Sequence, residues 1–178
     1  MVIYITGAPR CGKTTLAQKL LSEISDASLL SLDALSKAVR NTFTDFKLYS
    51  DKVLISPDIN RDVFLKFVKK YAEWFIEEYP DKTLIVEGCH FTPDEFKSGF
   101  YNSKIICMGL TSKKMICNCV LNKDWMSELS EKRRNEYVNL IYDYSLDMKT
   151  NENTDMYRYF EFEKMDFKDI LHYIEKGD

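Results

Sequence analysis

The sequence predicts an α/β domain in which a parallel sheet is covered by helices on both faces. Strand patterns and helix patterns alternate along the 178 residues. The predicted strands are short, nearly continuous apolar runs, which is typical of strands buried on both faces of a sheet. A glycine-rich turn, GAPRCGKT at 7–14, joins the first strand to the first helix. Because no Pro, Gly or Ser-rich linker interrupts the chain, we expect one domain over 1–178.

The individual elements are predicted from apolar periodicity and end signals. Strands are expected at 2–5, 28–32, 83–86, 104–110 and 156–162. Helices are expected at about 13–25, 34–40, 57–79, 93–99, 112–122, 130–148 and 167–176. Thr92 and Glu95 match a capping box that would begin the helix at Pro93. The stretch 41–56 shows no clear period, and we expect a substrate-binding segment over 34–60.

The turn at 7–14 has the G-x-x-x-x-G-K-T spacing of a phosphate-binding loop. In such loops consecutive backbone N–H groups surround the phosphates of a nucleoside triphosphate. Lys13 can reach the β- and γ-phosphates, and the Thr14 hydroxyl suits one coordination position of Mg²⁺. ATP and Mg²⁺ are therefore the expected cofactors. The residues predicted to bind the nucleotide are Gly7, Ala8, Pro9, Arg10, Cys11, Gly12, Lys13, Thr14 and Thr15.

Two carboxylates and a histidine follow the second and third predicted strands. Ligands of such sheets bind beyond the carboxyl ends of the strands, so these side chains are expected beside the phosphates. Asp33 would accept the proton of an acceptor hydroxyl or orient that hydroxyl; otherwise it would cap the following helix. Glu87 would hold a Mg²⁺-bound water or contact substrate, unless it is a surface-turn acid. His90 would donate to a substrate anion or only line the turn.

Four arginines are further candidates for contacts with the ligands. Arg133 and Arg134 follow a polar loop and could close over the triphosphate as part of a lid at 122–136, or they could form a solvated face. Arg40 is a weaker candidate for gripping an acidic acceptor, and Arg158 could approach the nucleotide base.

Composition narrows the class of partner. The chain has 25 basic and 28 acidic residues and a net charge of −3, which gives no general attraction to nucleic acid or to an anionic membrane. A small-molecule partner is favoured instead. No apolar run approaches the roughly 20 residues that span a bilayer, and the first apolar run is explained as a strand. We therefore expect a cytoplasmic protein, and the oligomeric state stays open.

The five cysteines include no C-x-x-C pair, and their number is odd. Neither a disulfide framework nor a zinc site is indicated. Cys11 differs from the others because it lies beside Lys13 at a helix N-terminus, where a thiolate would be stabilised. We expect oxidation or alkylation of Cys11 to block nucleotide binding.

The order of GAP and GKT within 7–14 is similar to the loop of adenylate kinases. With its alternating architecture, the chain resembles the P-loop small-molecule kinases, which include adenylate kinase, shikimate kinase, gluconate kinase and chloramphenicol phosphotransferase. The resemblance implies a three-layer P-loop NTPase fold with a five-stranded parallel sheet of order 2-3-1-4-5. It also implies a substrate region after the second strand and an arginine-bearing lid. Asp33 matches the acidic residue that many relatives use on the acceptor hydroxyl.

The chain departs from individual members of this group. EGCHF at 87–91 replaces the Asp-Gly-x-Pro-Arg of adenylate kinases, and Leu35 stands where shikimate kinases carry a second Asp. NKDW at 122–125 lacks the final Asp of the guanine-reading N-K-x-D motif, which disfavours a GTPase.

These observations predict a kinase that transfers the γ-phosphoryl group of ATP to a small-molecule acceptor. The acceptor group would be a hydroxyl or a phosphate of a metabolite, nucleoside or nucleotide. The alternative is a nucleotide-binding regulatory protein that hydrolyses ATP slowly or not at all.

Overall fold

Five parallel strands form one sheet in the part of the chain that the computed structural model describes, residues 1–43, 45–46, 60–93, 95, 103–120, 124–152 and 157–176. The strands are β1 (Val2–Gly7), β2 (Ala27–Ser31), β3 (Thr83–Glu87), β4 (Ser103–Gly109) and β5 (Arg158–Glu161). They pair in the order β2-β3-β1-β4-β5, which confirms the predicted topology. β1 therefore lies at the centre of the sheet.

The helices follow the strands as the sequence pattern predicts. They are α1 (Lys13–Glu23), α2 (Leu32–Thr42), α3 (Arg61–Glu78), α5 (Lys113–Val120), α6 (Asp124–Ser127), α7 (Glu131–Thr150) and α8 (Phe167–Glu175). Polar caps begin two of them. The Ser130 hydroxyl accepts from the backbone N–H of Arg133, and the Asp166 carboxylate accepts from that of Lys168.

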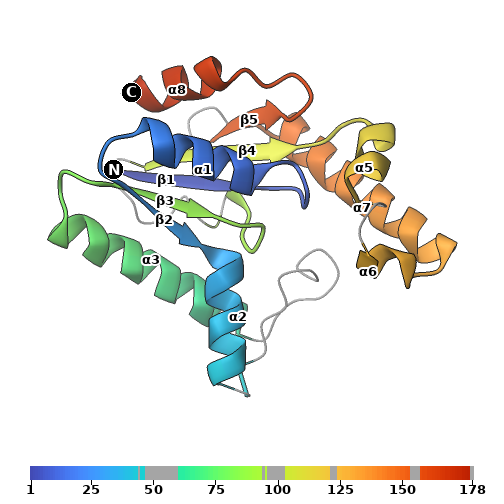
Figure 1. Ribbon diagram of the computed structural model, residues 1–178, viewed down its shortest axis with the longest axis horizontal. Coiled ribbons are helices and arrows are strands. Elements are labelled where there is room, and N and C mark those ends of the chain that lie inside the picture. Colours follow the sequence, from blue (N-terminus) through green and yellow to red (C-terminus); the bar gives the residue numbers. More distant parts are fainter. Residues whose placement is uncertain are drawn as a thin grey trace.

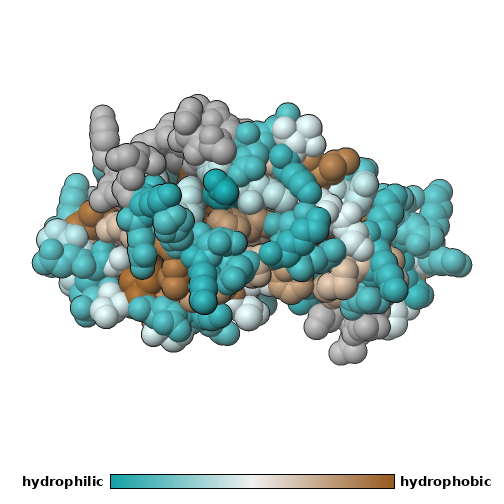
Figure 2. Space-filling view, turned by 90° about the horizontal axis from the view of Figure 1, so that it is seen from above, coloured by the Kyte–Doolittle hydropathy of each residue, from teal (hydrophilic) through white to brown (hydrophobic). Residues whose placement is uncertain are grey.

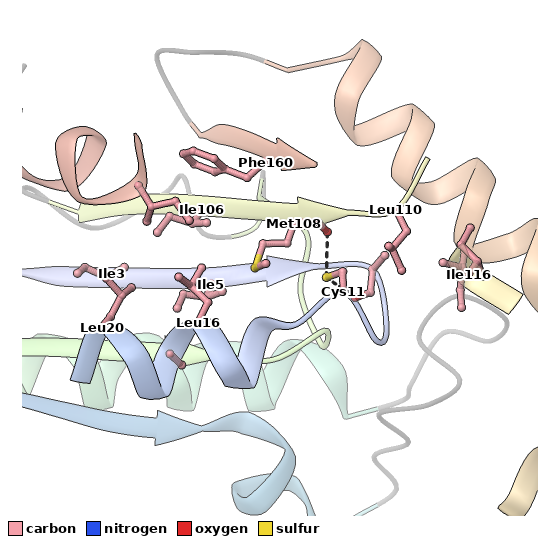
Figure 3. Close-up of a cluster of buried hydrophobic side chains, with 14 of the residues drawn as sticks. Ile3, Ile5, Cys11, Leu16, Leu20, Ile106, Met108, Leu110, Ile116 and Phe160 are labelled. Carbon is pink, nitrogen blue, oxygen red and sulfur yellow. Dashed lines mark hydrogen bonds between the residues drawn. The ribbon is translucent and has the colours of Figure 1, made fainter. Parts of the chain in front are cut away.

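Two hydrophobic cores lie on opposite faces of the sheet because successive side chains of β1 point in opposite directions. Ile3 and Ile5 face the first core, which α1, α5, α7 and α8 help to build. Figure 3 shows Leu16 and Leu20 of α1 turned toward this side of β1. Tyr4 faces the second core, which includes the buried side of α3. In Figure 1, α1 is drawn across β1, α8 lies above β5 and α3 lies below β2.

The structure differs from the sequence prediction at several element ends. α2 begins at Leu32 after the N-cap residue Ser31, so Asp33 lies in the first helical turn rather than at the cap. The short helix α6 lies within the stretch expected to be a polar loop. The Glu95 carboxylate accepts from the backbone N–H of Thr92 at 2.7 Å, as in the expected capping box. Most of the predicted helix 93–99 and much of the segment 34–60 lie outside the described residues.

The face of the molecule shown in Figure 2 is mainly polar. In Figure 2 most side chains are hydrophilic and the hydrophobic ones lie in small patches. No helix among the described residues is long and apolar enough to cross a bilayer.

The packing of α1 on the sheet leads to a stability prediction. Leu20 is fully buried in the first core, whereas its neighbour Leu21 is 38% exposed. Leu20→Ala should lower the free energy of unfolding by about 2–5 kcal/mol, because it removes transfer energy and leaves a cavity. Leu21→Ala, the matched control, should change it by about 0.5 kcal/mol or less. Urea denaturation measures both values, and equal losses would contradict this placement of α1.

Candidate nucleotide and acceptor site

The strand register brings the candidate residues to one edge of the sheet. Ile5 of β1 is paired with Glu87 of β3, which is in turn paired with Ser31 of β2. On the other side, Gly7 is paired with Met108 of β4. The carboxyl ends of β1, β2 and β3 therefore meet, and the loop at 8–12, Asp33 and the turn at 88–91 all leave from this edge.

The loop at 7–14 has a backbone that only certain residues can adopt. Gly7 and Gly12 have φ values of 119° and 83°. A Cβ on Gly7 would lie 1.9 Å from the carbonyl oxygen of Met108, and one on Gly12 would lie 2.6 Å from the ring of Phe162. Arg10 also has a positive φ, 65°. The loop is thus a tight turn that packs against β4 and against the residue following β5.

Lys13 lies within this loop at the start of α1. Its ammonium group is buried and donates to the carbonyl oxygen of Ala8 at 2.6 Å and to that of Gly7 at 3.3 Å. Burial alone would lower the pKa of Lys13. The neighbouring carboxylates of Glu87 and Asp33 favour the charged form, and the pKa of Lys13 is raised despite burial. The loop therefore holds a fixed positive charge where phosphates are expected.

Glu87 connects the loop to β2. Its carboxylate is buried and accepts from the Ser31 hydroxyl at 2.8 Å and from the Thr14 hydroxyl at 3.3 Å. This placement excludes the alternative of a surface-turn acid. Ser31 was not singled out in the sequence, because its role depends on its register opposite Glu87.

Asp33 and His90 approach each other across the edge. Nδ1 of His90 lies 3.6 Å from Oδ1 of Asp33. The His90 side chain is 2% exposed and packs 5.7 Å from the ring of Phe64, whereas that of Asp33 is 54% exposed. The pair thus presents an accessible carboxylate that is backed by a buried imidazole.

The turn that carries His90 is anchored from both sides. The Thr6 hydroxyl of β1 donates to the carbonyl oxygen of Phe91. Nε of Arg61, the first residue of α3, donates to the carbonyl oxygen of His90 at 3.2 Å. The same arginine forms an ion pair with Glu95. These contacts fix the position of the imidazole relative to the sheet.

Glu161, which ends β5, is a further residue of this region that the sequence analysis did not find. Burial would raise the pKa of its carboxyl group, but hydrogen bonds from Lys149, Thr111 and Lys164 outweigh burial and lower it to about 2. The next residue, Phe162, lies against Gly12. Glu161 therefore fixes the end of β5 that supports the phosphate loop.

The four candidate arginines lie in different environments. Arg133 is exposed, and Nε of Arg134 donates to the carbonyl oxygen of Leu129 at 2.9 Å. Arg40 is in the last turn of α2, roughly 10 Å along the helix axis from Asp33. Arg158 begins β5, the strand whose other end faces the phosphate loop. It borders a cavity of about 620 Å³. Contacts of these arginines with ligands stay predictions, and part of the expected lid, 122–123, lies outside the described residues.

The expected stabilisation of a Cys11 thiolate is wrong, whereas the effect of modifying Cys11 on nucleotide binding stays a prediction. The Cys11 sulfur is buried, 2.9 Å from the carbonyl oxygen of Ala8 and 3.3 Å from that of Met108, and Figure 3 shows it pointing into the core. Burial raises the pKa of the thiol and outweighs the opposing effect of Lys13. The helix N-terminus therefore does not produce a thiolate here.

The residues present fit a nucleoside triphosphate with Mg²⁺. The glycines keep the loop free of the Cβ atoms that would obstruct it, and Lys13 supplies positive charge. Thr14 and Glu87 supply hard oxygen atoms. Among the described residues, no group of three or more His, Cys, Asp or Glu side chains could hold a metal. Mg²⁺ commonly takes few protein ligands and completes its coordination with phosphates and waters.

The five-stranded parallel sheet and the phosphate-binding loop give this chain the fold of the P-loop small-molecule kinases. Similar solved structures include a tunicamycin resistance protein of Deinococcus radiodurans, with a TM-score of 0.62 and 13% identity over 97% of this chain and 92% of that one. A candidate kinase of Chloroflexus aurantiacus has a TM-score of 0.59 and 16% identity over 97% and 92%.

A third similar structure is a gluconokinase of Sinorhizobium meliloti, with a TM-score of 0.51 and 10% identity over 97% of this chain and 88% of that one. No protein-family model matches the sequence, and no curated protein matches it. At these identities the likeness shows a shared fold, and the substrate has to be argued from the site.

The burial of Cys11 predicts that its thiol resists alkylation. In the folded protein, iodoacetamide should label the partly exposed Cys117 and Cys119 well before Cys11, because the Cys11 sulfur is buried and its pKa is raised. Peptide mass spectrometry after timed labelling measures this order, and labelling in urea provides the control in which all thiols react. Early modification of Cys11 in the native state would contradict the burial.

Proposed function

We propose that this protein is an ATP-dependent phosphotransferase whose acceptor group is a hydroxyl of a small molecule. The observation that carries the proposal is the buried Glu87 carboxylate, which contacts both Thr14 of the phosphate loop and Ser31 at the end of β2. Through these contacts the loop is held beside the Asp33 and His90 pair. Kinase-fold neighbours support this reaction class.

Each residue has a distinct part in the proposed reaction. When bound, ATP supplies the phosphoryl group and Mg²⁺ neutralises charge on its phosphates. The backbone of 7–14 and the Lys13 ammonium bind the phosphates, and the ammonium exchanges its bonds to Gly7 and Ala8 for phosphate oxygens. Thr14 and Glu87 hold the metal, directly or through water. Asp33 accepts the proton from the acceptor hydroxyl.

Asp33 and Arg61 favour a hydroxyl over a phosphate acceptor. An exposed carboxylate can remove or orient a hydroxyl proton, whereas it would repel an anionic acceptor phosphate. Arg61, which lies behind His90, is already paired with Glu95. The contribution of His90 is to orient Asp33 from its buried position 3.6 Å away.

The test is ADP release from ATP and Mg²⁺ in the presence of single acceptors. The panel contains sugars, nucleosides, nucleotides and hydroxy acids, with gluconate and tunicamycin added because they occur in the names of structural neighbours. One hydroxyl compound should stimulate release strongly. Lys13→Ala should reduce the stimulated rate by about 10²-fold or more, because it removes charge stabilisation in the transition state. Lys19→Ala on the exposed side of α1 is the matched control.

The other outcomes separate the competing functions. ATP binding without stimulation by any compound would favour the regulatory protein that hydrolyses slowly or not at all. Stimulation by a nucleotide with transfer to its phosphate would retain the kinase and reject the hydroxyl acceptor. Absence of ATP binding, measured by calorimetry, would reject the nucleotide site.

Asp33 is predicted to act on the acceptor rather than on the nucleotide. Asp33→Asn should lower kcat by about 10²–10⁴-fold, because the amide cannot accept the proton, and should leave the Kd for ATP nearly unchanged. Stopped-flow kinetics and calorimetry measure the two quantities. Asp62→Asn, in the first turn of α3, is the control. Parallel loss of activity and ATP affinity would assign Asp33 a structural role.

A further inference from the structure

The outer face of α3 carries large apolar side chains that the fold leaves in contact with water. Val63, Phe67 and Trp74 are 55%, 50% and 61% exposed, and Tyr71 is also exposed. The buried side of the same helix is formed by Phe64, Val68 and Ala72. These four exposed residues, the α3 stripe, follow one another at spacings of four, four and three. They therefore form a continuous strip beside the buried face.

The α3 stripe is bordered by charged residues in an ordered pattern. Lys66 and Lys70 lie in the first half of the helix, and Glu73 and Glu77 lie in the second half. Spacings of four, three and four place all four on the same flank of the stripe. This flank is positive toward the start of α3 and negative toward its end.

We propose that the α3 stripe is the contact surface of a homodimer in which α3 packs antiparallel against α3 of a second copy. A twofold axis places each flank beside the same flank of the other helix with its direction reversed. Lys66 then faces the partner's Glu77, and Lys70 faces the partner's Glu73. In a parallel pair the charged flank of each helix would instead face the other side of the partner's stripe, and these ion pairs would not form, so the charges favour the antiparallel arrangement.

The ion pair that these charged side chains form within one chain can be replaced by ion pairs between two chains. Lys70 is paired with Glu73 at 2.7 Å and lies 5.9 Å from the centre of the Trp74 ring. Both groups of the pair are substantially exposed, and ion pairs of this kind contribute little to stability. Exchanging this pair for one between two copies therefore costs little, while the apolar stripe loses its contact with water.

The size of the surface predicts a weak dimer. An 18-residue helix is about 27 Å long. One such face offers less than the roughly 800 Å² per partner of a standard stable interface. We therefore expect the dissociation constant of the dimer to lie between about 1 µM and 1 mM. Such a Kd corresponds to a modest binding free energy.

The experiment uses sedimentation velocity across this concentration range with two charge variants of the full chain. The all-acidic flank of K66E/K70E and the all-basic flank of E73K/E77K should each repel their own copies, so each variant should sediment as a monomer. Mixing the two should restore a dimer with one chain of each kind, because the flanks are then complementary. Native mass spectrometry identifies that heterodimer.

Control variants keep the result falsifiable. K168E/K176E places the charge change of K66E/K70E on two exposed positions, Lys168 in the first turn of α8 and Lys176 at its C-cap, and should dimerise like the unmodified chain. Trp74→Ala should weaken association at least tenfold, and circular dichroism should show an unchanged fold. The proposal is overturned by a monomer at every concentration, by a dimer that the charge variants do not affect, or by the lack of a heterodimer on mixing.

Discussion

The buried carboxylate of Glu87 is the group on which the geometry of the site depends. A buried charge is costly unless hydrogen bonds satisfy it. Glu87 meets this requirement with the hydroxyls of Ser31 and Thr14, and the charged Lys13 lies nearby. The ends of β2 and β3 and the start of α1 are consequently held in one arrangement. Any ligand that binds at this edge meets a site whose central charges are already positioned.

Much of this edge could be predicted from the sequence because its signals are local. The spacing of Gly7, Gly12 and Lys13 predicts the loop, and the apolar runs predict where β2 and β3 end. Asp33 and Glu87 follow directly from those ends. Ser31 and the hydrogen bonds of Glu161 could not be found in this way, since they depend on register and on helices far along the chain. Cys11 misled the prediction because a helix N-terminus says nothing about burial.

The shared fold and the particular acceptor are separate questions. The three similar structures named above are 10–16% identical to the chain, and one fold can serve several substrates through different side chains at the same edge. The acceptor side here consists of Asp33, a buried His90 and the ring of Phe64. The segment at 47–59, which the sequence associates with substrate, lies outside the described residues. The exposed carboxylate of Asp33 and the buried imidazole of His90 are the groups that support a hydroxyl acceptor.

The two faces of α3 connect the site with the proposed dimer. Its first residue, Arg61, donates to the carbonyl oxygen of His90, and Phe64 packs against the imidazole. The α3 stripe lies on the same rigid helix, one face away. A contact that orders α3 would therefore also restrict His90, which lies next to Asp33. Dimer formation would then affect acceptor turnover more than ATP affinity, because Lys13 and Thr14 belong to α1, on the other side of the sheet.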